Sequence, residues 1–414
     1  MVPKGWKLTS LGEICNGNLQ TGPFGSQLHA HEYVPVGIPV LMPKDLIGCR
    51  AKLADAAKIN QKKAQELKKH FLKTGDLLFS RRGDVARFAL IDEESEGSIC
   101  GTGCLKARPS DKHSSAFLAY FLQKDSIRKW LEQNAVGQTM PNMNTEILNE
   151  LPLMAASSKQ EEDRIAQILS TWDNAISVTE KLLTNSQLQK KALMQQLLTG
   201  KKRLLDENGE RFSGEWKRVK LGAIADMNSG GTPKSTVEEY YGGNIPWVSI
   251  SDMTSNGKWI ATTEKYLTEL GLNSSSARIY PKNSVLYAMY ASIGECSIAA
   301  VNLTSSQAIL GIRPKDCLNY EFLYFYLTSL KEKIKLQGQQ GTQSNLNTGM
   351  VKEFELDLPS IREQQKIAAV LSVADAEIST LEKKLACLRD EKKALMQQLL
   401  TGKRRVKVDE AVAE

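Results

Sequence analysis

Two adjacent arginines followed by a glycine, Arg81-Arg82-Gly83, are the residues of this chain best suited to contact a nucleic acid. An arginine guanidinium can donate two hydrogen bonds to guanine, lysine mostly contacts phosphate, and asparagine or glutamine can pair with adenine. For each such side chain taken singly, the alternative is an ordinary solvated surface residue. The charged and aromatic candidates are Lys44, Lys58, Lys62, Lys63, Arg81, Arg82 and Arg87 in the first half, and Lys234, Trp247, Lys258, Lys265, Tyr287 and Tyr290 in the second.

Two uncharged segments, Gly137–Asn144 and Gly341–Asn347, are rich in glutamine, asparagine and threonine. Such side chains suit hydrogen bonds to base edges, and they equally suit the capping of a turn that follows them. Both interpretations stay open from the sequence. The candidates for DNA contacts in these segments are Gln138, Asn142, Gln343 and Asn345.

Sequence patterns typical of catalysis or cofactor binding are missing. There is no Gly-x-Gly-x-x-Gly, no Walker A sequence and no Asn/Asp-Pro-Pro-aromatic sequence of adenine methyltransferases. The seven cysteines are scattered without a Cys-x-x-Cys, and His29-x-His31 is the only histidine cluster, so we expect no disulfide framework and no metal site. The sequence indicates a non-catalytic protein that binds no cofactor and lends specificity to chemistry performed by others.

The composition suits a protein with real hydrophobic cores. The chain has 414 residues, of which 41% are hydrophobic, and its formal net charge of +7 is compatible with nucleic acid without requiring it. The first residues lack the apolar region of a signal peptide, and no run of eighteen apolar residues occurs. We therefore expect a cytoplasmic protein without a membrane partner.

The peptide KKALMQQLLTGK occurs twice without a single difference, at Lys190–Lys201 and at Lys392–Lys403. Shorter matches precede both copies, such as Trp6-Lys7 with Trp216-Lys217, whereas residues 48–80 barely resemble residues 254–285. Internal repetition of this kind sets the architecture of a chain. It predicts two bodies that share a scaffold but present different surfaces.

Each copy of the peptide ends a long segment with a helical pattern. Residues 159–198 contain neither proline nor glycine, and in the second copy Ala374, Leu381, Leu388 and Leu395 recur every seven residues. Such spacing is typical of a coiled coil. An internal bundle or a homodimeric coiled coil would explain it, but the similar stripes favour pairing of the two helices within one chain. An antiparallel pair would set the distance between the bodies.

The segments outside the long helices predict compact α+β domains. Short apolar runs separated by turn residues, such as Ile38–Met42 and Asp76–Ser80, predict strands, and Ala116–Gln133 and Tyr320–Gln337 predict helices. We therefore divide the chain into a first recognition domain at 1–156, a central helical spacer at 157–202, a second recognition domain with a short linker at 203–358, and a C-terminal helical spacer with a tail at 359–414.

Several of these segments, taken in order, resemble the specificity (S, or HsdS) subunits of type I restriction–modification systems. The resemblance covers essentially the whole chain. In the first copy, Leu151-Pro152-Leu153 is followed by Ala-Ala-Ser-Ser, which departs from the family's pattern. The segments that carry the resemblance are Trp216–Val219 with Leu221-Gly222, Ser229–Pro233, Tyr241–Asp252, Gly341–Thr348, Leu356–Ile367 and both MQQLLTGK helix ends.

This resemblance implies that one target recognition domain reads each half of an asymmetric, bipartite site in double-stranded DNA. It also implies docking of two methyltransferase subunits, and of restriction subunits where the system cleaves DNA. S-adenosylmethionine and ATP with magnesium would bind to those partners and not to this chain. The alternative is a stand-alone, two-headed DNA-binding regulator. The repeated peptide suggests the residues that dock the methyltransferase subunits: Gln195, Gln196, Leu198, Gln397, Gln398 and Leu400.

Overall fold

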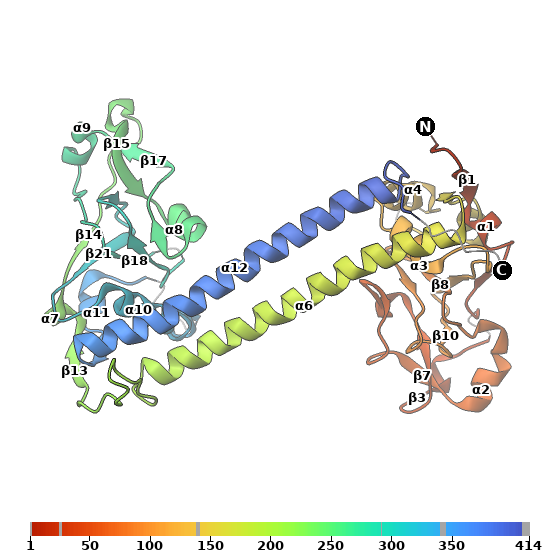
Figure 1. Cartoon of the computed structure of the whole chain (residues 1–414), viewed down its shortest axis with the longest axis horizontal. Helices are drawn as coiled ribbons and strands as arrows, with labels where there is room; N and C mark the ends of the chain where they lie inside the picture. Colours follow the sequence, from red (N-terminus) through yellow and green to blue (C-terminus); the bar gives the residue numbers. More distant parts are fainter. Residues whose placement is uncertain (1, 25–26, 138–140, 291, 340–344, 408–414) are drawn as a thin grey trace. The chain divides into compact units, whose positions relative to one another are not determined.

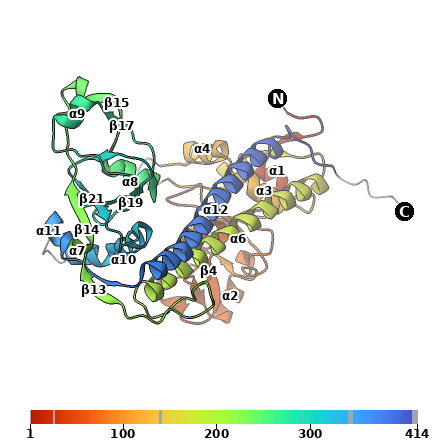
Figure 2. The same cartoon turned by 60° about the vertical axis from the view of Figure 1, so that its left-hand side comes forward.

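The computed structural model describes residues 2–24, 27–137, 141–290, 292–339 and 345–407 (Figures 1 and 2). The chain forms two compact units, of which the first is built from two stretches of chain and the second from one. The first unit comprises Met1–Thr179 with Lys384–Glu414, and the second comprises Glu180–Lys383. Each unit therefore contains one globular body and one end of both long helices.

The body of the first unit is built on a six-stranded sheet with the order β2-β11-β8-β9-β6-β5. A four-stranded sheet, β10-β4-β7-β3, and a two-stranded pair, β1-β12, complete it. The strands are β1 Lys7–Ser10, β2 Leu19–Thr21, β3 Tyr33–Val34, β4 Ile38–Leu41, β5 Leu46–Ile47, β6 Cys49–Ala51, β7 Ala57–Ile59, β8 Leu77–Ser80, β9 Phe88–Leu90, β10 Ile99–Cys100, β11 Cys104–Ala107 and β12 Pro152–Ala155.

The body of the second unit repeats this plan. Its sheets have the orders β14-β21-β18-β19-β16, β17-β15-β20 and β13-β22. The strands are β13 Lys217–Lys220, β14 Ala225–Ser229, β15 Tyr241–Val248, β16 Trp259–Ile260, β17 Lys265–Leu267, β18 Val285–Ala288, β19 Cys296–Ala299, β20 Thr304–Ser305, β21 Ile309–Pro314 and β22 Glu355–Leu358.

Five strands of the two large sheets correspond in order, and β5 of the first sheet has no counterpart in the second. In each, the central strand (β8 or β18) pairs antiparallel with both of its neighbours, and a parallel pair (β6 with β9, β16 with β19) lies toward one edge. The strand positions expected from the short apolar runs are confirmed to within a few residues. The structure thus confirms an α+β fold built from two similar bodies.

The helices of the bodies differ more than the sheets. The helix expected at 116–133 is wrong as a single helix: it is broken into α3 and α4 at Gln123 and Lys124. Lys124 has an extended backbone, which interrupts the helix, and Phe121 and Ile127 on either side of the break are buried in the same core. The short helices are α1 Leu11–Ile14, α2 Gln61–Glu66, α3 Ser115–Leu122, α4 Asp125–Asn134, α5 Thr145–Asn149, α7 Leu221–Ile224, α8 Ile250–Asn256, α9 Glu269–Asn273, α10 Tyr320–Gln339 and α11 Thr348–Lys352.

The two long helices are α6, Lys159–Leu197, and α12, Ile361–Leu399, and each has 39 residues (Figure 1). In the first unit Asp173, early in α6, accepts a hydrogen bond of 2.5 Å from Lys392, late in α12. In the second unit Lys190, late in α6, pairs with Asp375, early in α12. The helices therefore pair within each unit, as the heptad pattern suggested, and they run antiparallel.

The ends of the long helices complete the hydrophobic cores of the bodies. Leu399 and Leu400 belong to the same core cluster as Phe79 and Phe117 in the first unit. Leu197 and Leu198 belong to the corresponding cluster of the second unit. The apolar part of the repeated peptide thus does the same job in both units, which is to close a core.

Both long helices end in a glycine with a left-handed backbone, Gly200 (φ 67°) and Gly402 (φ 63°), which confirms the expected caps. An arginine three residues later then forms a two-pronged ion pair with a buried glutamate. Arg203 Nε lies 2.6 Å from Glu363 Oε1, and Arg405 Nε lies 2.6 Å from Glu161 Oε1. Each long helix end is therefore fixed by a glycine turn and an equivalent ion pair.

Among the residues that the structure describes, no helix has the length and apolar character required to cross a bilayer.

Candidate nucleic-acid interface

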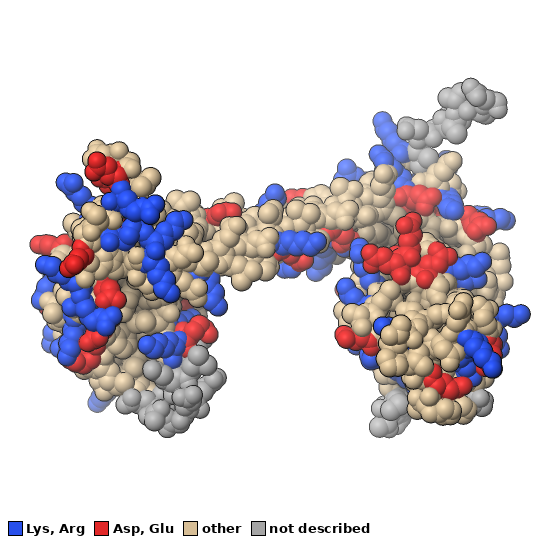
Figure 3. All heavy atoms as spheres, turned by 90° about the horizontal axis from the view of Figure 1, so that it is seen from below, with Lys and Arg blue, Asp and Glu red and all other residues tan. Residues whose placement is uncertain are grey.

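Charge alone does not mark an interface. On the face drawn in Figure 3, lysine and arginine side chains are interspersed with acidic ones on both bodies. The candidate site is defined instead by the backbone contacts of the predicted residues.

Two segments selected from the sequence lie against each other at the end of β8. Arg81 accepts a backbone hydrogen bond of 2.8 Å from Met143, and the backbones of Arg82 and Asn142 form an isolated antiparallel bridge. The turn 81–83 and the segment 141–143 together are called the first tip. The structure thus brings Arg81, Arg82 and Asn142 to one place, although 60 residues separate the two segments.

An aromatic side chain that the sequence analysis did not select also belongs to the first tip. The guanidinium carbon of Arg81 lies 5.7 Å from the centre of the Phe24 ring, and Phe24 is 57% exposed. Its position in Gly22-Pro23-Phe24-Gly25 was visible as a turn, but exposure of a phenylalanine is set by packing and not by local sequence.

The first tip contains two buried polar atoms that have no hydrogen-bond partner within the described part of the chain. They are Arg81 Nε and Asn142 Oδ1. A buried donor or acceptor without a partner is costly, by roughly 1–3 kcal/mol. The tip therefore holds one donor and one acceptor that the described part of the chain leaves without a partner.

The second unit has an equivalent tip at the end of β18. Leu346 donates a backbone hydrogen bond of 3.0 Å to Met289, as Met143 does to Arg81 in the first unit. The next residue, Tyr290, is 40% exposed, and Asn345 is exposed. Residues 289–290 and 345–348 together are called the second tip.

The tips share a backbone frame but differ in chemistry. Met289 and Tyr290 of the second tip stand where Arg81 and Arg82 stand in the first. The preceding loops also correspond, because Gly22 donates to Cys104 of β11 and Gly230 donates to Ile309 of β21. By this register Thr232 occupies the place of Phe24. One tip is cationic with a phenylalanine, and the other is neutral with a tyrosine.

The alternative that the amide-rich segments cap helices is confirmed for two of their residues. Asn144 accepts a hydrogen bond from Ile147 at the start of α5, and Asn347 accepts one from Met350 at the start of α11. Asn142 and Asn345 do not take part in capping, so they stay candidates for contacts with a ligand. Gln138 and Gln343 lie outside the described residues.

Comparison with known proteins decides the family. The model of the type I restriction modification DNA specificity domain matches residues 3–186 and 213–388. The chain belongs to this family. Each of the two matched ranges contains one of the bodies described above, so the chain carries two specificity domains.

Individual relatives agree with this assignment. The chain is 24% identical over 421 residues to the putative type I restriction enzyme MjaX specificity subunit of Methanocaldococcus jannaschii, covering 98% of this chain and 95% of that protein. It is 36% identical to the MjaIX specificity subunit of the same organism over 172 residues, which span 41% of this chain and 40% of that protein.

A solved structure shows the same fold over the whole chain. The crystal structure of the type I restriction–modification system S subunit from M. genitalium superposes with a TM-score of 0.61 at 17% identity, covering 95% of this chain and 96% of that one. At this identity the likeness concerns the fold alone.

Three of the other basic candidates of the first specificity domain have partners inside it. Lys44 donates to the carbonyl of Asp55, and Lys63 pairs with Glu32 and Glu66. Arg87 donates to the carbonyl of Pro43 and lies 3.7 Å from Asp84. Lys58 is half-buried on β7, and Lys62 is exposed on α2.

Three candidates of the second specificity domain are corrected by the structure. Trp247 is 8% exposed and donates its indole hydrogen to the carbonyl of Gly231, and Tyr287 is fully buried. Lys258 Nζ lies 2.8 Å from Glu321, with its side chain 14% exposed. These side chains face the core or a partner inside the domain, so they are not available to read DNA here.

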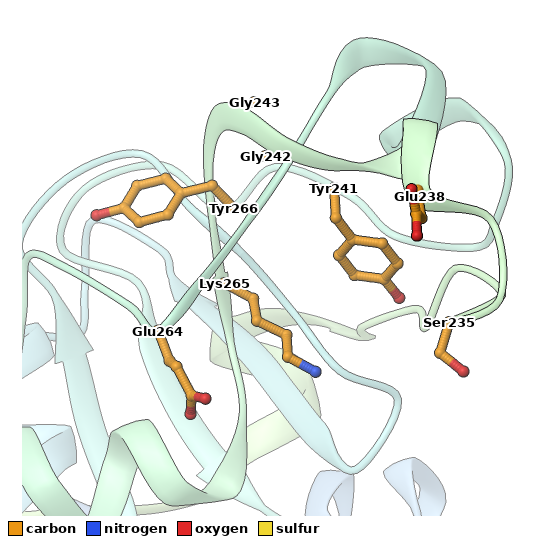
Figure 4. A pocket seen from close by; sticks show the side chains of 8 residues that line it. All are labelled: Ser235, Glu238, Tyr241, Gly242, Gly243, Glu264, Lys265 and Tyr266. Carbon is orange, nitrogen blue, oxygen red and sulfur yellow. The ribbon is translucent and has the colours of Figure 1, made fainter.

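The remaining basic candidates, Lys234 and Lys265, are exposed. Lys265 lines a cavity of about 650 Å³ between β15 and β17, where its Nζ lies 6.0 Å from the centre of the Tyr241 ring (Figure 4). Glu238 and Glu264 also line this cavity, whereas the Tyr266 ring points away from the Tyr241 ring. The two carboxylates oppose the approach of phosphate, so the cavity is a poorer candidate than the tip.

The suggested docking residues divide into two classes. Gln195, Gln196, Gln397 and Gln398 are exposed at equivalent places on α6 and α12. Leu198 and Leu400 are 5% and 0% exposed because they close the cores, so we remove them from the docking surface.

A metal centre is not apparent either. No group of three or more His, Cys, Asp or Glu side chains suited to hold a metal occurs among the described residues. Burial raises the pKa of the Cys100 thiol to about 12, which keeps this cysteine protonated and unreactive at neutral pH.

Proposed function

We propose that this chain gives a type I restriction–modification complex its DNA specificity, with each tip reading one half of a split, asymmetric DNA site. The observation that carries the proposal is the pair of tips: one backbone frame built twice, with different side chains at its end. A protein that must recognise two different sequences with one scaffold needs this arrangement.

The side chains of the first tip suit direct contacts with a duplex. Arg82 is exposed and no ion pair within the described residues holds it, so it is free to donate to guanine or phosphate. Asn142 is adjacent and offers an amide, which suits adenine. We infer that the first specificity domain reads its half-site mainly through these two side chains and Arg81.

The second tip offers different chemistry. Tyr290 and Asn345 are both exposed and uncharged. A tyrosine hydroxyl and an asparagine amide can bond base edges without binding phosphate strongly. We therefore expect the second half-site to differ in sequence from the first and to depend less on salt.

The same proposal assigns the exposed glutamines of the repeated peptide to partner docking. Gln195 and Gln196 on α6 are equivalent to Gln397 and Gln398 on α12, and core packing does not explain why both pairs are the same. Two identical surfaces suit two identical methyltransferase subunits. S-adenosylmethionine, and ATP with magnesium where restriction subunits join, would bind on those partners.

The long helices would fix the gap between the two half-sites. α6 and α12 each continue without a break from one unit into the other. A helix rises by about 1.5 Å per residue, and one turn of DNA spans roughly 34–36 Å, so the number of helical residues would determine the number of unread base pairs.

The test is to map N6-methyladenine across the host genome by single-molecule sequencing, with and without this gene. We expect methylation at one split, asymmetric motif to disappear when the gene is deleted and to return when it is restored. If no motif changes in a host that expresses the partner methyltransferase, the proposal is wrong, and a stand-alone regulator becomes the better hypothesis.

A further inference from the structure

Phe24 is exposed at the first tip without an evident structural reason. A single exposed apolar residue is ordinarily of no significance, because much of any protein surface is apolar. The backbone that carries Phe24 and the groups around it set this residue apart.

The backbone before Phe24 is tightly held. Gly22 donates to the carbonyl of Cys104, and a Cβ at Gly22 would lie 1.8 Å from the carbonyl oxygen of Gly101, so only glycine fits there. Pro23 is buried. The loop therefore approaches the sheet so closely that the direction in which Phe24 leaves it is fixed.

The main chain of Phe24 itself is held by Gln27. The Gln27 backbone donates to the carbonyl of Phe24 at 2.8 Å, and the Gln27 side-chain oxygen accepts from the Phe24 backbone at 3.2 Å. Both polar groups of the Phe24 main chain are thus satisfied. A ring presented on a fixed backbone loses little entropy when it binds, which favours its use in recognition.

The first tip places polar groups of Arg81 and Asn142 together with the Phe24 ring. Arg81 holds its guanidinium 5.7 Å from the ring centre, and its buried Nε has no partner within the described residues. Asn142 Oδ1, on the same tip, is likewise unpaired. An exposed aromatic ring beside a cationic guanidinium matches a nucleobase, which offers a flat face for stacking and belongs to a negatively charged strand.

We propose that Phe24 is a wedge that stacks on a base at a distorted step of the first half-site, with Arg81 supporting the ring. This inference rests on the proposed function and specifies how the first tip reads DNA. In an undistorted duplex every base face is covered by its neighbours, so a stacked phenylalanine requires a kinked or partly unstacked step. Pyrimidine–purine steps open most easily, and we expect one at this place.

The second specificity domain supplies a contrast within the same molecule. Thr232 replaces Phe24 there, and its hydroxyl accepts a hydrogen bond of 3.4 Å from the Gln307 backbone. A small side chain engaged with its own domain cannot act as a wedge. Distortion is therefore expected in one half-site only.

The experiment uses the full chain in complex with its methyltransferase subunits and a duplex carrying the mapped motif. 2-Aminopurine, which fluoresces when it is unstacked, replaces each adenine of both half-sites in turn, the methylated adenines excepted. We expect fluorescence to rise at one step of one half-site with the wild-type protein and with Phe24→Tyr. Phe24→Ala should remove this signal and weaken binding roughly 5- to 100-fold, the range for loss of one stacked base.

The control is Val36→Ala, which removes an 87% exposed side chain from the same body and should change neither quantity. Wild-type fluorescence and affinity in Phe24→Ala would overturn the wedge while leaving the methylation result of the proposed function intact. Loss of the methyltransferase subunits from Phe24→Ala during purification would also overturn it, because the ring would then contact a protein. Failure of the wild-type complex to bind its motif would overturn the proposed function itself.

Discussion

Single residues decide what each specificity domain can recognise, because the two tips differ in side chains and not in backbone. Arg82 and Tyr290 occupy equivalent places. Replacing either by alanine should therefore affect one half-site and leave the other unchanged.

We expect Arg82→Ala to weaken recognition of base pairs in one half-site, by about 1–3 kcal/mol per lost base contact. Methylation at the motif should fall as a result. Tyr290→Ala should relax positions of the other half-site. Motif mapping in cells that carry each variant measures both effects. Lys68→Ala, an exposed lysine of the same body that is not a candidate for DNA contact, is the matched control. Relaxation of the same half-site by both variants would contradict one tip per half-site.

A second prediction at the residue scale concerns pH. His70 is 2% exposed, and burial, with Lys69 and Lys106 nearby, lowers its pKa to about 4. The ordinary pKa of a histidine is about 6.5. Between pH 6.5 and pH 4, therefore, His70 binds a proton in the unfolded chain but not in the folded protein. Stability of the first unit should fall as pH drops from 6.5 toward 4, by at most about 1.4 kcal/mol per pH unit from this group.

Denaturant unfolding of wild type and His70→Gln at pH 7 and pH 5 measures this contribution. The difference in stability between the two proteins should shift in favour of the variant at the lower pH. An unchanged difference would show that His70 is protonated in the folded protein.

At the scale of elements, the two identical helix ends are held by unlike surroundings. A Cβ at Gly402 would lie 2.6 Å from the Pro3 side chain, whereas a Cβ at Gly200 would meet Trp216 at an ordinary 3.5 Å. Both glycines have a positive φ, which costs a side chain roughly 1–2 kcal/mol. The clash adds to this cost only at Gly402.

We therefore expect Gly200→Ala to destabilise the second unit by about 1–2 kcal/mol, and Gly402→Ala to destabilise the first by roughly 2–4 kcal/mol. Thermal or denaturant unfolding measures the loss. Because the sequences around both glycines are identical, each variant controls for the other. Equal losses would show that Pro3 moves aside without cost.

At the scale of the whole molecule, each long helix begins in one unit and closes the core of the other. Leu400 completes the core of the first unit and Leu198 that of the second. The first unit therefore consists of two stretches of chain that lie far apart in sequence. Its stability therefore depends on the C-terminal end of α12 as well as on the first 179 residues.

Leu400→Ala should lower the stability of the first unit by about 2–5 kcal/mol, as expected for a large-to-small change in a core. Hydrogen exchange read by mass spectrometry should show faster exchange in β8 and β11 and little change in β18 and β21. Leu198→Ala should give the opposite pattern. Leu188→Ala removes a 61% exposed side chain of α6 and should change neither. Faster exchange in both bodies with either variant would mean that the units unfold together.

The sequence by itself determined the repeat, the two long paired helices and the α+β bodies, whereas the contacts between the helices show that they run antiparallel. These features rest on short-range patterns: identical peptides at a fixed offset, a seven-residue period and a glycine cap can be recognised without knowing any distant contact. Residue type and loop composition selected Arg81, Arg82 and Asn142, and short segments in order carried the resemblance to specificity subunits.

Only the tertiary structure decided which of the selected residues are available. Trp247, Lys258 and Leu400 look like surface or interface residues in sequence, but neighbours from distant segments cover them. Phe24 shows the reverse case, since the sequence analysis did not select it and the structure leaves it exposed beside Arg81. Burial depends on packing between segments far apart in the chain, and local pattern contains no measure of it.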